Sequence, residues 1–264
     1  MLDTSAVRPP NVESRRTAAG AFNRDRVAYR VAREMAIWIL DSGLPEGSRL
    51  PPEMELCTAL GASRTGVRSA LRILESWGLI AIQTGRYGGP VVRHPRVSDL
   101  TDTLSILIHS EHATLMDVLT ARRAIDPIIA AEAAERATPD DLKSLDEAIG
   151  RLRRASLTQR DFLAATSQFQ SVLADASHLV ILGLLLRILA SFGETALMQR
   201  VPHDDEWRQH VLASFEKIHE AVARHDREAA RATMLLLRME SDRHWQERGA
   251  ALLQVPLEPF EFGS

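Results

Sequence analysis

The sequence contains one cysteine, Cys57, in 264 residues, and this excludes an internal disulfide framework. Its longest apolar run, from Leu179 to Leu186, is far too short to span a bilayer. The N-terminal residues lack the apolar core that a signal peptide requires. These absences predict a cytoplasmic protein with no membrane-spanning segment.

Lysine is also nearly absent, since only Lys143 and Lys217 occur, and almost all positive charge is arginine. Residues 1–96 hold 14 arginines against 9 acidic residues, whereas the remainder carries a net charge of −8. A basic first third followed by an acidic remainder predicts one DNA-facing domain and one domain that does not face DNA. From charge alone, chance asymmetry is the other explanation.

Motifs for catalysis are missing as well. The sequence has no glycine-rich phosphate loop, no serine or cysteine nucleophile motif and no HExxH pair. Acidic residues in the second part fall at the spacing of solvated helix faces. The sequence therefore predicts a protein that is not an enzyme and has no catalytic residues.

The first part of the chain has an ordered pattern of helices and strands. Residues 1–22 are polar and aperiodic, which indicates a mobile arm. An apolar stripe of Val27, Val31, Met35 and Ile39, with Ile37 nearby, predicts a helix that ends at Ser42-Gly43. A turn over 44–50 follows. The pattern then predicts a helix over 53–60 with Pro52 in its first turn, a helix over 64–77 capped by Ser63, and strands at 79–83 and 90–93.

The remainder is helical in pattern. After a linker near 95–98, helices are expected near 98–110, 114–137, 139–155, 159–176, 178–200, 204–224 and 227–248. The segment 179–197 is apolar on nearly every side, which predicts a central helix of the bundle. The predicted fold is mainly α: an N-terminal winged helix-turn-helix (23–95) with a small β-hairpin wing, a C-terminal all-α helical bundle (96–250) and a tail (251–264).

Three segments carry a family resemblance. Leu50–Leu56, Leu60–Leu71 and Leu74–Ile80 together resemble the signature of the GntR family of transcription regulators. The helical remainder resembles the FCD ligand-binding domain of that family's FadR subgroup, most clearly over Ala121–Pro127 and Ala221–Ala230.

The helix after Ser63 is the candidate for DNA reading, because a recognition helix enters the major groove with its N-terminus first. Arg64 and Arg68 lie four residues apart, hence on one face, and arginine can bind guanine bidentately. The resemblance also implies that the tip of the wing contacts DNA. The candidate DNA-binding residues are Arg49, Ser63, Arg64, Thr65, Arg68, Arg72, Thr84, Gly85 and Arg86.

Some of these assignments have alternatives. Arg72 and Arg86 could belong to an ordinary solvated face, and Arg49 could bind phosphate or stabilise its turn. Met54 stands where the family often has arginine, and Gly66 where a larger residue is common. These departures affect the operator sequence that the domain would read.

Many FCD domains hold a divalent metal through an aspartate, a histidine four residues later and two further histidines. The matching positions here are Thr166, Gln170, Phe215 and Leu237, and none of them is a good metal ligand. The resemblance therefore predicts a domain without a metal or other cofactor. A shifted metal site built from flanking histidines, among them His210, His219, His225 and His244, is the alternative.

The same resemblance implies an effector pocket. Its candidate residues are Arg122, Asp126, Thr166, Gln170, Phe215, His219 and Leu237. Arg122 could bind an anion or pair with Asp126, one helical turn later. The mixture of polar and apolar positions predicts a partly apolar effector, such as an aromatic or acyl compound or a lipid-like acid.

Together these features predict a transcription regulator that binds an inverted-repeat operator in double-stranded DNA as a homodimer. A small-molecule effector in the helical domain would alter DNA affinity, and repression is the family's more common mode. The alternative is an architectural DNA-binding protein that responds to no effector.

Overall fold

The computed structural model describes residues 22–85, 88–154, 158–200, 205–254 and 256–257. The chain divides into two compact units, residues 1–100 and 101–264. Residues 1–21, most of the predicted arm, lie outside the described residues. Of the helices described, none has the length and apolar character needed to cross a bilayer.

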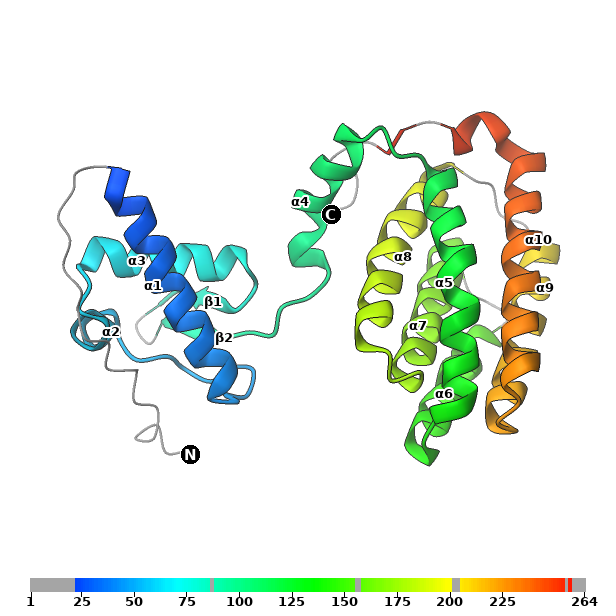
Figure 1. Ribbon diagram of the computed structural model, residues 1–264, viewed down its shortest axis with the longest axis horizontal. Helices are drawn as coiled ribbons and strands as arrows, with labels where there is room; N and C mark the ends of the chain where they lie inside the picture. The colour runs from blue at the N-terminus through cyan, green and yellow to red at the C-terminus, as the bar shows by residue number, and fades with distance from the viewer. Residues whose placement is uncertain (1–21, 86–87, 155–157, 201–204, 255, 258–264) are drawn as a thin grey trace. The chain divides into compact units, whose positions relative to one another are not determined.

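The first unit contains α1 (Phe22–Asp41), α2 (Glu53–Leu60), α3 (Arg64–Ser76), β1 (Ile80–Gln83) and β2 (Gly89–Val92) (Figure 1). This is the predicted order of a winged helix-turn-helix. Pro52 differs slightly from expectation. It occupies the N-cap of α2 in an extended conformation rather than the first turn, and it supplies no side-chain cap.

Strand β2 has hydrogen-bonded partners on both of its edges, whereas the sequence pattern predicts a partner on one edge only. Strands β1 and β2 pair antiparallel, from Ile80 opposite Val92 to Gln83 opposite Gly89. The segment 47–50, predicted as a turn, also pairs along β2: Gly47 N donates to Val92 O at 2.8 Å and Leu50 N to Pro90 O at 3.0 Å. The wing is therefore anchored on both sides of β2.

The predicted stripe of α1 is buried in the core of this unit, where Val31, Met35 and Ile39 pack with residues of α2 and α3. Ile37 is not part of the stripe, and its side chain is exposed. Two residues from both Met35 and Ile39, it falls nearly on the opposite side of a helix with 3.6 residues per turn.

The second unit is an all-α bundle, as predicted. Its helices are α4 (Ser98–Ser110, whose first residues belong to the first unit), α5 (Leu115–Arg136), α6 (Pro139–Leu152), α7 (Gln159–Ala176), α8 (Val180–Arg200), α9 (Asp205–Ala223) and α10 (Arg227–Leu253). Helix α5 packs against α7, α8, α9 and α10, and Figure 1 shows it between α8 and α10. The main core lies among these helices and α6.

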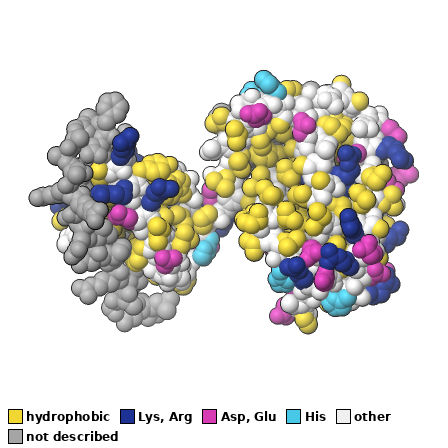
Figure 2. Space-filling view, viewed as in Figure 1, with side chains coloured by type: hydrophobic (Ala, Val, Ile, Leu, Met, Phe, Trp, Pro, Cys, Tyr) yellow, Lys and Arg dark blue, Asp and Glu magenta, His cyan; other side chains and the backbone are white. Residues whose placement is uncertain are grey.

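Helix α8 corrects the prediction of a central helix apolar on every side. Leu186 and Phe192 are buried, but Val180 and Ile181 are 71% and 69% exposed, and Leu184 and Leu185 are also exposed. Neighbouring helices α5 and α7 cover one side of α8 only. Figure 2 shows hydrophobic side chains gathered over the region where α8 and α5 lie in Figure 1. The described part of α8 therefore leaves an apolar face uncovered.

The C-terminal segment also differs from expectation. Helix α10 continues to Leu253, past a non-helical residue at Gly249, although the pattern placed its end near 248 and a tail from 251. Beyond it, Leu257 is buried and its N–H donates to Ala113 O at 3.0 Å. The chain up to Leu257 is thus part of the second unit.

Helix α6 begins with a capping box that gives a test of local stability. Asp141 N donates to Thr138 Oγ1 at 3.2 Å, and Thr138 N donates to an Asp141 carboxylate oxygen at 2.9 Å. Burial raises the pKa of Asp141, but the hydrogen bonds from Thr138 and His178 outweigh it, so the pKa lies below its usual value.

We expect Thr138→Ala to lower the free energy of unfolding by about 1 kcal/mol at pH 7, because the helix loses its cap. The folded-state pKa of Asp141 is the lower one, so this contribution is present above the unfolded pKa of 3.8 and is lost as the pH falls through the folded value. Urea unfolding at pH 7 and at acid pH measures both effects. Ser144→Ala, at an exposed position of the same helix, is the control, and equal losses in the two variants would contradict the assignment.

Candidate nucleic-acid interface and effector cavity

Helix α3 has one buried and one exposed face. Its buried residues are Val67, Ala70, Leu71 and Leu74. The exposed residues include Arg64, Thr65, Arg68 and Arg72, all of them predicted DNA-binding positions. Ser63, also exposed, caps the helix by accepting a hydrogen bond from Gly66 N at 3.1 Å. The first turns of α3 therefore present a basic face to solvent.

Gly66 has a structural role next to this cap. A Cβ atom at residue 66 would lie 3.3 Å from Ser63 Oγ, which is tighter than an ordinary van der Waals contact. The glycine lowers helix propensity, but it leaves room for the cap hydroxyl beneath it. The sequence pattern showed only the first of these two effects.

Arg68 is not a free cation in this structure. Its Nε lies 2.8 Å from Glu53 Oε2 on α2, with both side chains partly exposed. An exposed ion pair contributes at most about 1 kcal/mol, so a phosphate group could displace Glu53. The pair holds Arg68 near the start of α2, and Glu53 would have to release Arg68 before this arginine could bind a phosphate group.

We expect Glu53→Gln to raise the affinity for a labelled duplex DNA by up to about fivefold, because it releases Arg68 from a pair contributing at most about 1 kcal/mol. Fluorescence anisotropy at fixed salt measures the change. Glu55→Gln removes the same charge from an exposed position of the same helix and serves as the matched control. If both variants gained equally, general charge rather than release of Arg68 would be responsible.

The wing contributes the remaining candidates. Thr84 and Gly85 are exposed at the end of β1. Gly85 has φ of +111°, a conformation that side chains rarely adopt. Arg86 lies outside the described residues. Arg49 is exposed, as a phosphate contact requires, and its backbone forms a bridge with Val91 of β2 that anchors its turn.

The second unit contains a cavity of about 80 Å³, here called the inner cavity. Five of the seven predicted effector residues line it: Arg122, Thr166, Gln170, Phe215 and Leu237. Asp126 does not line it but bonds to Arg122. His219 lies elsewhere, with its Nε2 3.0 Å from Asp146 Oδ1 of α6.

A buried charge cluster forms one wall of the inner cavity. Arg122 Nη2 donates to Asp126 Oδ2 at 3.1 Å, and also to Gln170 Oε1. Arg238, from α10, places its Nε 2.7 Å from the same Asp126 oxygen. Both guanidinium groups are at least nine-tenths buried, and Asp126 is almost completely buried. The pairing of Arg122 with Asp126 was one of its two predicted roles.

This cluster holds two arginines for one aspartate. Burial, together with the charge of Arg122, lowers the pKa of Arg238 to about 10, so Arg238 keeps its charge at neutral pH. Among the described residues, Arg122 Nε and Arg238 Nη2 have no hydrogen-bond acceptor. Because unpaired buried charge is costly, the arrangement favours an additional anion.

Sequence reasoning missed Arg238. The available signal was a charge inside the apolar segment Met234–Met239, immediately after the predicted cavity residue Leu237. A lone charge in such a segment often has a buried partner. The partner, Asp126, lies more than a hundred residues earlier, so only the packing of α10 against α5 reveals the pair.

The residues of the inner cavity do not suit the divalent metal that many FCD domains hold. Thr166 and Gln170 are weak ligands, Phe215 and Leu237 are none, and Thr166 Oγ1 already donates to Phe162 O at 2.8 Å. Within the described residues, no group of three or more histidine, cysteine or acidic side chains could hold a metal. Of the flanking histidines, His210 pairs with Glu240 and His225 with Ala134 O.

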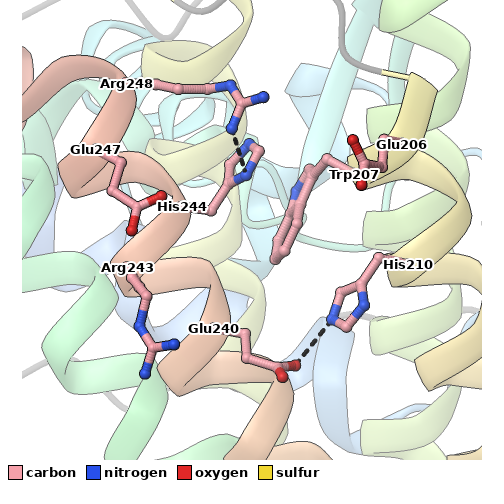
Figure 3. A pocket seen from close by; sticks show the side chains of 8 residues that line it. All are labelled: Glu206, Trp207, His210, Glu240, Arg243, His244, Glu247 and Arg248. Carbon is pink, nitrogen blue, oxygen red and sulfur yellow. Dashed lines mark hydrogen bonds and ion pairs between the residues drawn. The ribbon is translucent and has the colours of Figure 1, made fainter.

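An outer cavity of about 310 Å³ lies between α9 and α10 (Figure 3). Trp207 lines both cavities. Its ring stacks on His244 with 4.1 Å between centroids, and His210 lies near its other side at 5.1 Å. Trp207 therefore stands between the inner and outer cavities.

Comparison with known proteins agrees with this architecture. The sequence profile of the bacterial regulatory proteins of the gntR family matches residues 28–87, and that of the FCD domain matches residues 117–237. A solved structure of a GntR protein from Streptococcus agalactiae covers 82% of this chain and 99% of its own, with a TM-score of 0.66 and 24% identity.

Several curated relatives align over most of their length. An HTH-type transcriptional regulator of Mycobacterium tuberculosis is 34% identical over 80% of this chain and 86% of its own. The Uxu operon transcriptional regulator of Escherichia coli is 30% identical over 71% and 74%, and the galactonate operon transcriptional repressor of the same organism is 27% identical over 84% and 96%. These relatives and both matched families are regulators rather than enzymes. The chain therefore belongs to the GntR family and is a transcription regulator composed of a winged helix-turn-helix unit and an FCD domain.

Proposed function

We propose that this regulator binds an inverted-repeat operator as a homodimer, with α3 of each copy in the major groove. The observation that carries the proposal is the exposed basic face of α3, where Arg64, Arg68 and Arg72 surround a capped N-terminus. The exposed wing tip at Thr84 and Gly85 supports a contact with an adjacent groove.

We also propose that the inner cavity binds a small anionic effector without a metal. The positive excess of Arg122 and Arg238 over Asp126 supports an anion, and a carboxylate suits the two planar guanidinium groups. Phe215 and Leu237 would contact an apolar part of the same molecule. At about 80 Å³ the cavity is well below the usual range of about 300–1,000 Å³ for ligand sites, so the effector is compact unless Trp207 moves.

Repression is the expected mode of regulation. One relative, the galactonate operon regulator, is a repressor by name. In this mode the dimer covers its operator, and effector binding changes the geometry of the two reading units and lowers DNA affinity.

Capture of genomic DNA by the tagged protein, followed by sequencing, tests the DNA-binding proposal. The expected result is a small set of sites that share an inverted repeat, confirmed by gel shift with purified protein. Uniform coverage of the genome without a shared repeat would contradict it and would favour an architectural role. Expression of a reporter gene placed downstream of a captured site should rise when the regulator gene is deleted.

A thermal-shift screen with small carboxylates tests the effector proposal. Binding to the folded state raises the melting temperature by mass action. We expect stabilisation of the wild-type chain by at least one compact carboxylate, and none of Arg238→Met by that compound. Chelation with EDTA should leave the response unchanged. Stoichiometric metal in the purified protein, or a response that EDTA abolishes, would overturn the metal-free site.

A further inference from the structure

Trp207 is the one residue, among those that the structure describes, that lines both the inner and the outer cavity. Elsewhere along α9 and α10, chain neighbours line different cavities. His210 and Glu240 line the outer cavity, whereas Val211 and Ser241 line the inner cavity. The packed edge between α9 and α10 therefore separates the two cavities, and the Trp207 side chain forms the part of this edge that both cavities share.

Ring contacts hold the Trp207 side chain in place (Figure 3). Its ring lies between two histidine rings, with centroids 4.1 Å from His244 and 5.1 Å from His210 and interplanar angles of 18° and 24°. Each histidine has a partner of its own. Glu240 Oε2 lies 2.8 Å from His210 Nε2, and Arg248 Nη1 lies 3.1 Å from His244 Nδ1. The indole is therefore a well-packed partition between the cavities.

The inner cavity has a cationic end and an aromatic end. Arg238 and Trp245 both line it from α10, seven residues apart, which corresponds to about 10 Å along a helix. Trp245 lies edge-on to the Trp207 ring, with 6.1 Å between centroids. Phe215 and Leu237 supply apolar walls. A carboxylate bound at Arg238 would therefore extend its apolar part toward Trp207.

We propose that Trp207 limits the length of the effector and is thus a specificity-determining residue of the inner cavity. The inference rests on the anionic effector proposed above and adds the residue that decides how far such a molecule can extend. At about 80 Å³, the inner cavity has about half the volume of an apolar cavity of roughly 150 Å³ that accepts benzene. It therefore has room for only about three carbon-sized atoms. An acid with a longer tail would meet the indole of Trp207.

Without the indole, the inner and outer cavities would form one continuous space. The outer cavity measures about 310 Å³, so the joined space would reach the usual range of about 300–1,000 Å³ for ligand sites. The tail of a longer acid could then take the place of the indole, between the rings of His210 and His244 and against Trp245. Its carboxylate would stay at Arg122 and Arg238. The length limit therefore depends on one side chain.

Titration calorimetry of the full chain with straight-chain acids from acetate to octanoate tests the inference. Wild-type affinity should rise while the added carbons fit the inner cavity and should then fall by about tenfold or more at octanoate, because overfilling a packed site is costly. Trp207→Ala should instead gain affinity along the series, by up to about fourfold for each methylene that becomes buried. Trp207→Leu, a milder truncation, should move the limit in the same direction. Arg243→Ala alters the outer cavity but keeps the indole, so it should retain the wild-type limit.

The outcomes separate the role of Trp207 from the effector proposal. An unchanged length limit in Trp207→Ala and Trp207→Leu, both folded by circular dichroism, would overturn the role of Trp207 alone. Octanoate that binds wild type as tightly as Trp207→Ala would do the same. Arg238→Met added to Trp207→Ala should abolish octanoate binding, and binding that survives would show a separate outer site and overturn the continuous space. If neither wild type nor any variant binds an acid of the series, the anionic effector site is wrong and the inference falls with it.

Discussion

Asp126→Ala is expected to destabilise the helical unit by about 3–5 kcal/mol, because it leaves two buried arginines without their shared counter-charge. Asp126 is 1% exposed, and the structure offers no other carboxylate bonded to Arg122 or Arg238 among the described residues. Unfolding in urea, followed by circular dichroism, measures the loss. Asp175→Ala removes an exposed partner of Arg187 and should cost less than about 1 kcal/mol.

The double variant Asp126→Ala with Arg238→Met separates charge from packing. Removal of one of the two uncompensated charges should recover part of the stability lost in Asp126→Ala, so the two substitutions are not additive. If the double variant were less stable than Asp126→Ala by the full cost of Arg238→Met alone, the loss would come from packing. The charge cluster would then give no reason to expect an anionic effector.

Arg64→Ala is expected to weaken binding to the captured operator by about 5–150-fold, the equivalent of about 1–3 kcal/mol for one bidentate base contact. Arg64 is exposed at the first residue of α3, and no described residue forms an ion pair with it. This loss of affinity should be larger on the intact operator than on an operator in which the base pair contacted by Arg64 is already mutated. Gel shift or anisotropy with both duplexes measures the difference.

Two controls decide how Arg64 acts. Arg64→Lys keeps the charge but loses the bidentate geometry, so it should resemble alanine on the operator if Arg64 reads a base. If Arg64 instead binds phosphate, Arg64→Ala should weaken binding to both duplexes equally. The slope of log affinity against log salt concentration should then fall by about one, as for the loss of one phosphate contact. Wild-type affinity in Arg64→Ala would show that α3 reads DNA through another face. Circular dichroism should show unchanged folding in each variant.

Local patterns in the sequence predicted most elements correctly. The apolar stripe of α1 and the cap at Ser63 each depend on residues within a few positions of one another. Such signals survive in the folded chain because the helical period and the cap geometry are local properties. The prediction failed at α8, where composition showed an apolar helix but not how much of it its neighbours would cover.

The residue pattern was enough to predict the order of the two units, helix α3 with its exposed arginines, and five of the residues around the inner cavity. The packing of the helices was needed to show that Arg238 joins Arg122 at Asp126, that Glu53 holds Arg68, and that α5 and α8 share an uncovered apolar face. Each of these depends on which helices pack side by side. A residue's own neighbours in the chain fix its helix and face, but the partner across that face comes from a distant segment.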